Sequence, residues 1–184
     1  FEQNVNVSVT PKNGTPADAR AEKIVAHFAD KKIKKLELSD NVEVSQKPSK
    51  VRAKFATAFF ENELKKVDLR ENVEIENSEN GRTTNARGNN ATAYFNNGFQ
   101  RAELTENVEI DSTAENESPT KIRSQVAIYD KAADKFELKN SVEIITSADD
   151  KPNTINSGEA IYEQSIGKIF LTGGAIIRQA NDII

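Results

Sequence analysis

The chain has 184 residues and carries 29 acidic against 25 basic side chains, a formal net charge of −4. This balance argues against strong nucleic-acid affinity. The absence of Cys excludes disulfides, thiolate metal sites and thiol nucleophiles. The length favours one domain, residues 1–184, large enough for an apolar core.

One short phrase returns five times along the chain. It reads LSDNVEV at 38–44, LRENVEI at 69–75, LTENVEI at 104–110, LKNSVEI at 138–144 and LTGGAII at 171–177. Each copy follows a segment of the type Ala-x-aromatic, and these segments begin at Ala26, Ala58, Ala93, Ala127 and Ala160. Such regular spacing is typical of a repeat architecture. The sequence therefore predicts five repeats of about 33 residues.

Each repeat is predicted to form a strand, a tight turn and a second strand. The expected turns are polar: Asn96-Asn97-Gly98, Glu61-Asn62-Glu63, Asp130-Lys131 and Glu163-Gln164-Ser165. In the second strand, apolar residues recur at every second position, as in Val67, Leu69, Val73 and Ile75. In the first strand, the alternation does not decide which face points inward. We favour the face that carries the small and aromatic residues as the inner one.

A polar residue or Gly interrupts the apolar face of each second strand at one repeated position. The residues there are Asp40, Glu71, Glu106, Asn140 and Gly173. This predicts a bulge or corner that bends the strand. The segments 77–90, 111–121 and 145–157 are polar and rich in Gly, Pro or Asn, and are expected to be loops at one end of the stack. The predicted fold class is all-β, with two facing antiparallel sheets joined along bent strands.

The repeated pattern resembles the OstA-like domain of the periplasmic A and C components of the lipopolysaccharide transport (Lpt) machinery. The resemblance covers residues 19–179 and is clearest at 157–179, SGEAIYEQSIGKIFLTGGAIIRQ. The first four repeats depart from it, because they carry Asp-Asn, Glu-Asn or Asn-Ser where the family has Gly-Asn. The A and C types are not distinguished by these residues.

The resemblance implies a V-shaped β-jelly roll that clasps lipid acyl chains between its sheets and pairs end to end with partner jelly rolls. It also implies a location in the periplasm of a Gram-negative bacterium. The chain begins at Phe1 rather than Met, which is compatible with a removed signal peptide or N-terminal anchor. Lipid movement would be driven by an upstream ATPase, since no nucleotide-binding motif is present.

The expected lipid-binding residues line an apolar trough that is open along its length. They are Phe28, Phe60, Phe95, Tyr129 and Tyr162, together with Leu38, Leu69, Leu104, Leu138 and Leu171. The expected partners are lipopolysaccharide or a related lipid, and other Lpt-type jelly rolls joined through edge strands; self-association is an alternative. The last strand, Ile176-Ile177-Arg178-Gln179, is less charged than its equivalents, as an edge with a partner would be.

Several alternatives stay open at this point. The repeated apolar face is compatible with a dry, filled core, and the protein with a structural β-solenoid or filament without lipid. The basic residues between Lys31 and Lys66 suit either phosphate binding or a solvated surface. His27 and the abundant carboxylates show no catalytic or metal-ligand pattern, so neither an enzyme nor a cofactor is expected.

Overall fold

The computed structural model describes residues 5–9, 17–79, 81–96, 99–115, 118–148, 151–163, 166, 168–179 and 182–183. Within them lie fourteen strands. They are β1 (Val5–Val9), β2 (Ala17–Ala21), β3 (Lys23–Ala29), β4 (Lys32–Gln46), β5 (Ser49–Glu61), β6 (Glu63–Glu79), β7 (Arg82–Phe95), β8 (Phe99–Ala114), β9 (Thr120–Asp130), β10 (Lys135–Ala148), β11 (Lys151–Glu163), β12 (Lys168–Thr172), β13 (Ile176–Gln179) and β14 (Asp182–Ile183).

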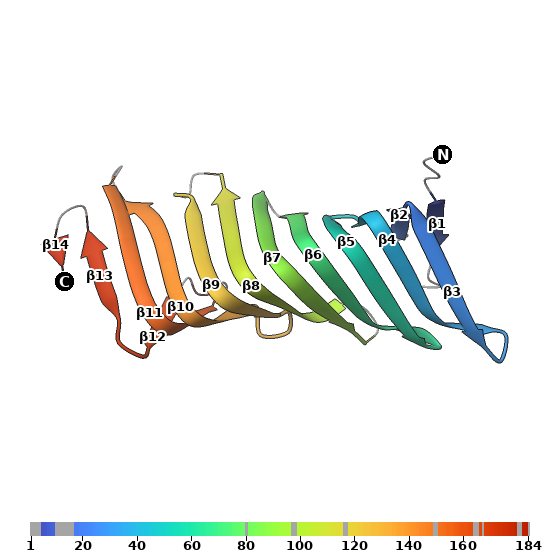
Figure 1. Cartoon of the computed structure of the whole chain (residues 1–184). Helices are drawn as coiled ribbons and strands as arrows, with labels where there is room; N and C mark the ends of the chain where they lie inside the picture. The colour runs from blue at the N-terminus through green and yellow to red at the C-terminus, as the bar shows by residue number, and fades with distance from the viewer. Residues whose placement is uncertain are drawn as a thin grey trace.

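The strands form one antiparallel sheet in which chain neighbours pair with each other. The main order is β1-β2-β4-β5-β6-β7-β8-β9-β10-β11-β13-β14, with β3 beside β4 and β12 beside β11. Figure 1 shows this row of strands running from the blue N-terminal end to the red C-terminal end. None of the described residues belongs to a helix that is long and apolar enough to cross a membrane.

Each long strand bends at the predicted corner. The corner of β6 is formed by Glu71 and Asn72, which both have positive φ, 60° and 55°. Three further pairs with positive φ lie at the same place in β4, β8 and β10: Asp40-Asn41, Glu106-Asn107 and Asn140-Ser141. Gly173-Gly174, also with positive φ, lies between β12 and β13. Two residues of the bent strand oppose one residue of its neighbour there, so the predicted bulge is confirmed.

The corners divide the sheet into two arms (Figure 1). The hairpin arm contains β3, β12 and the strand halves that meet at the turns after β3, β5, β7, β9 and β11. The linker arm contains β1, β2, β13 and the opposite halves. At both ends of the sheet the bent strand is interrupted at the corner: β3 and β2 both pair with β4, and β12 and β13 both pair with β11.

The predicted all-β architecture is confirmed, but the extent of the loops is wrong. The two facing sheets are the two arms of one continuous sheet. Segments 77–90, 111–121 and 145–157, expected as loops, lie mostly in strands of the linker arm. A low apolar content did not prevent strand pairing there.

The turns at Asn62 and after Asp130 lie where the sequence places them, since β5 ends at Glu61 and β9 ends at Asp130. The turns predicted at Asn96-Asn97-Gly98 and Glu163-Gln164-Ser165 extend beyond the described residues, which omit Asn97, Gly98, Gln164 and Ser165.

Candidate functional site

The apolar residues of successive strands are in register and form continuous rows on one face of the sheet, here called the inner face. The leucine row lies next to the corner on the hairpin arm, and Leu and Ala alternate along it from β4 onward. It consists of Ile24, Leu38, Ala56, Leu69, Ala91, Leu104, Ala127, Leu138, Ala160 and Leu171. Leu38, Leu69, Leu104 and Leu138 are buried, whereas Leu171 on the last strand is half-buried.

A second row, the hairpin row, lies one step nearer the hairpin turns and changes character along the sheet. It consists of Ala26, Leu36, Ala58, Val67, Ala93, Ala102, Tyr129, Phe136, Tyr162 and Ile169. Side chains are small or aliphatic as far as β8 and aromatic from β9 to β11. Tyr129 and Phe136 have ring centroids 4.8 Å apart, and Phe99 stacks on Tyr129 at 6.2 Å.

The five aromatic residues expected at one repeated position occupy two different rows. Phe28, Phe60 and Phe95 lie at the hairpin ends, opposite Ile33, Leu64 and Phe99. Tyr129 and Tyr162 lie one step nearer the corner, in the hairpin row. The prediction was wrong because Ala127 pairs with Leu138 across a hairpin two residues shorter than the one in which Ala91 pairs with Leu104.

The linker row is the counterpart on the other arm. It consists of Val7, Ala19, Val44, Val51, Ile75, Ala86, Ile110, Ile122, Ile144, Ile155 and Ile177. Ile110, Ile122 and Ile144 are fully buried, at most 4% exposed. The equivalent residues of β4–β6, Val44, Val51 and Ile75, are only partly buried. The two arms therefore cover each other more completely over β8–β10 than over β4–β6.

Residues of both arms meet across the inner face. Ile110 and Ile122 of the linker arm and Phe136 and Tyr162 of the hairpin arm line one cavity of about 20 Å³. This volume is close to that of a single water-sized probe. The expectation of a trough open along its whole length is therefore wrong for this part of the sheet, because aromatic side chains fill the space between the arms.

Tyr129 belongs to this filled part. Its hydroxyl lies 3.3 Å from Oδ1 of Asp134, and burial, together with that carboxylate, raises the pKa of Tyr129 above its ordinary value. The phenol is therefore neutral near pH 7 and donates the hydrogen bond. It fixes the aromatic cluster to the turn between β9 and β10.

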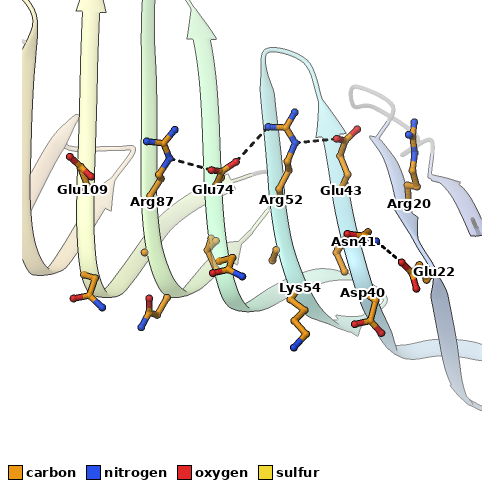
Figure 2. A pocket seen from close by; sticks show the side chains of 17 residues that line it. Arg20, Glu22, Asp40, Asn41, Glu43, Arg52, Lys54, Glu74, Arg87 and Glu109 are labelled. Carbon is orange, nitrogen blue, oxygen red and sulfur yellow. Dashed lines mark hydrogen bonds and ion pairs between the residues drawn. The ribbon is translucent and has the colours of Figure 1, made fainter.

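The outer face carries a charged ladder that sequence reasoning missed. Arg and Glu alternate across eight strands of the linker arm: Arg20, Glu43, Arg52, Glu74, Arg87, Glu109, Arg123 and Glu143. Figure 2 shows Arg52 between Glu43 and Glu74, with Nε 3.2 Å from Glu43 and Nη1 3.6 Å from Glu74. The sequence contained the signal, since the Glu residues belong to the repeated phrase and the Arg residues recur 32–36 residues apart.

The ladder borders a shallow cavity of about 950 Å³ at the corners of β2–β8 (Figure 2). Acidic and basic side chains alternate in its wall, and the hydrogen bond from Lys121 holds the pKa of Glu109 below its usual value. Five acidic and four basic side chains line the wall, so its charges nearly cancel and little net charge is left to attract an ion. Its evident role is to fix the register between neighbouring strands.

The basic residues predicted as one cluster are divided between two places. Lys31, Lys32, Lys34, Lys35, Lys65 and Lys66 lie at the first two described hairpin ends, whereas Lys47, Lys50, Arg52 and Lys54 lie near the corner or on the linker arm. His27 lies on the outer face with Nε2 3.0 Å from Glu37, which also accepts a 2.6 Å hydrogen bond from Lys35.

Exposed apolar side chains gather at the two ends of the sheet. Phe28 and Ile33 lie at the N-terminal end, and Ile161, Ile166, Phe170, Ile176 and Ile177 at the C-terminal end. Phe170 lies on the outer face and is 49% exposed. At the same row position, β4, β6, β8 and β10 carry Glu or Asp. Ile176 likewise replaces the Glu of the charged ladder. The outer face of the last bent strand therefore carries two exposed apolar side chains, Phe170 and Ile176, at row positions that are acidic in β10.

Among the described residues, no group of three or more His, Asp or Glu side chains is placed to hold a metal ion. No family model matches the chain, and no curated protein is similar to it in sequence. The crystal structure of LptH from Pseudomonas aeruginosa is similar, with a TM-score of 0.57, 15% identity, and coverage of 69% of this chain and 83% of LptH. LptH is described as the LptA-homologous periplasmic component of the conserved lipopolysaccharide transport device. The likeness confirms the predicted jelly-roll fold.

Proposed function

We propose that residues 1–184 form a single periplasmic jelly-roll module of a lipopolysaccharide transport bridge. The inner face binds acyl chains of lipopolysaccharide or a related lipid, and the end strands pair with partner jelly rolls. The observation that carries this proposal is the partly exposed apolar inner face of β4–β6, in a fold shared with LptH. Location in the periplasm of a Gram-negative cell is part of the same proposal.

The inner face offers enough apolar surface for a reversible lipid contact. Burying fourteen CH₂ groups contributes at most about 11 kcal/mol, at about 0.8 kcal/mol for each group. Loss of translational freedom and ordering of the chain offset a large part of this. The remainder suits a carrier that holds a lipid and then releases it to a neighbour.

The sheet ends are the proposed docking sites for partners. β12, the hairpin-arm part of the last bent strand, pairs with β11 along one edge, and its other edge has no neighbour within the described residues. In the linker arm, β14 pairs only with Arg178 and Gln179 of β13. At the other end, β3 is paired only with β4. An unpaired edge with exposed Phe170 can extend the sheet into another molecule through backbone hydrogen bonds.

The proposal is tested with two neighbouring phenylalanines that face opposite sides. Phe60 belongs to the inner face, whereas Phe59 lies on the outer face beneath Lys66 Nζ, 4.7 Å from its ring centroid. Native mass spectrometry of the chain mixed with a lipid A-type glycolipid should show a bound lipid. Phe60→Glu should lower the lipid-bound fraction, and Phe59→Glu should leave it unchanged.

A structural repeat protein without lipid is the second candidate, and the closed packing over β8–β10 favours it. In that case the same spectra would show self-association alone, and both variants would behave as the wild type does. Retention of lipid by the wild type and Phe59→Glu, with loss in Phe60→Glu, is the result that excludes this candidate.

A further inference from the structure

The inner face is not uniform along the sheet, and both arms change in character between β6 and β9. On the linker arm, Val51 and Ile75 are partly buried, whereas Ile110 and Ile144 are buried. On the hairpin arm, the hairpin row changes from small side chains to aromatic ones after Ala102. Two independent rows therefore mark the same boundary, close to β7–β8.

We propose that this boundary divides the inner face into a binding stretch and a closed core. The binding stretch, β4–β6 with the adjoining hairpin end of β3, takes the acyl chain of an anionic amphiphile. The closed core, β8–β11, is filled by the chain's own aromatic residues and takes no ligand. This inference rests on the proposed function and assigns a place to its lipid.

The size of the side chains explains the division. Over the binding stretch the hairpin row offers Leu36, Ala58 and Val67, which leave the linker row partly uncovered. Over the closed core Phe136 and Tyr162 reach the linker arm and leave only about 20 Å³ between them and Ile110. An acyl chain fits against the first surface, and it would have to displace packed aromatic rings from the second.

The charge at the hairpin ends indicates which end of an amphiphile lies there. The side chains of Lys31, Lys34 and Lys65 make no hydrogen bond or ion pair with the part of the chain that the structure describes. They lie at the turns that open the binding stretch, where Phe28 is 64% exposed. The excess of basic residues is at the turn between β3 and β4, where Asp30 is the one acidic residue beside four lysines, Lys31, Lys32, Lys34 and Lys35. At the turn between β9 and β10, Asp130 and Asp134 balance Lys131 and Lys135.

Unpaired ammonium groups beside an apolar surface are complementary to an anionic headgroup, with its phosphate or carboxylate at the lysines and its chain on the inner face. A neutral amphiphile of the same length would use the apolar surface alone. The lysines therefore predict a preference for the anionic ligand, and this preference is lost at high salt.

A titration of ¹⁵N-labelled protein with decyl phosphate, monitored by NMR, tests the division directly. Amide shifts are expected at Val44, Val51 and Ile75 and not at Ile110, Ile122 or Ile144. Decyl maltoside should produce the same map with lower affinity, and inorganic phosphate should shift only amides near the lysines. Equal shifts over both stretches would overturn the division while leaving lipid binding intact. No shift at all with either detergent would overturn the proposed function.

Three variants extend the test. Ala58→Trp fills the binding stretch and should weaken decyl phosphate binding about tenfold, without lowering the melting temperature. Phe136→Ala empties the closed core and should extend the map to Ile110 and Ile122. If Phe136→Ala does not fold, Ala58→Trp still decides, because unchanged affinity in that variant would contradict the assigned place.

The triple variant Lys31→Gln, Lys34→Gln and Lys65→Gln should abolish the preference for decyl phosphate over decyl maltoside.

Discussion

Phe136 of β10 and Ile110 of β8 line the same small cavity although they lie on opposite arms of the bent sheet. Each sits on the apolar side of its strand, so the two arms face each other across apolar surface. The shared cavity shows that the bend turns a one-layer sheet into a two-layer core.

The corners are expected to depend on residues that tolerate a left-handed backbone. Asn107 has φ of 56°, a conformation that costs an ordinary L-residue roughly 1–2 kcal/mol. Asn107→Val should therefore lower the free energy of unfolding by at least about 1 kcal/mol, and Asn107→Gly should not. Urea denaturation measures both. Thr105→Val, two residues earlier and outside the corner pair, is the control; an equal loss in all three would count against the corner as the cause.

The leucine row is expected to dominate stability where the core is closed. Leu138 is fully buried, and its replacement by Ala should cost about 2–5 kcal/mol in chemical denaturation. Leu36, in the hairpin row of the binding stretch, is only partly buried. Leu36→Ala should cost clearly less, under about 2 kcal/mol. Similar losses at the two positions would contradict the difference in burial between the leucine row and the hairpin row.

The C-terminal end is expected to mediate association. Phe170→Glu restores the acidic residue that β10 carries at this row position and adds charge to the exposed edge. Sedimentation velocity should show oligomers of the wild type that grow with concentration, and a shift toward monomer in the variant. Tyr94, 40% exposed in the middle of the sheet, provides the control. If Tyr94→Glu dissociates the oligomers equally, the edge is not the interface.

The ion pairs around Glu37 predict how stability changes in acid. Hydrogen bonds from Lys35 and then His27 lower the pKa of Glu37 from 4.5 to about 2. Because the unfolded chain takes up this proton first as the pH falls, the contribution is complete above pH 4.5 and is lost progressively toward pH 2. Glu37→Gln should therefore show a smaller fall in melting temperature between pH 5 and pH 2 than the wild type.

The matched control is Glu63→Gln, since Glu63 makes no ion pair within the described residues. Its melting temperature should follow the wild-type curve. The exposure of the Glu37 side chain, 43%, keeps the difference small. An identical pH profile for Glu37→Gln and the wild type would show that the pair contributes nothing to the folded state.

Much of the fold is readable from local pattern. The alternation around Val67 and Val73 specifies which face is buried, and the polar residue at Glu71 marks the corner. What escaped prediction is long-range. The polar segment 82–90 forms a strand because neighbouring strands satisfy its backbone, a stabilisation that no local propensity reports.

The apolar inner face was predicted, but not the way in which its rows change along the sheet. The leucine row was identified because its residues repeat in the sequence. The row of Tyr129 could not be assigned by alignment, because its hairpin is shorter by two residues. A change of two residues keeps a side chain on the same face of the sheet but moves it to the neighbouring row. The closure over β8–β10 arises from contact between the arms, which sequence spacing does not encode.

The central claim is that an acyl chain reaches the inner face, and site-specific labelling tests it most directly. Because the chain has no Cys, Val51→Cys and Arg52→Cys each give a single label, on the inner and outer faces of one strand. A polarity-sensitive fluorophore at each position is titrated with a lipid A-type glycolipid. The predicted result is a saturable blue shift at position 51 with none at position 52. No shift at either position, or the same shift at both, would contradict the claim.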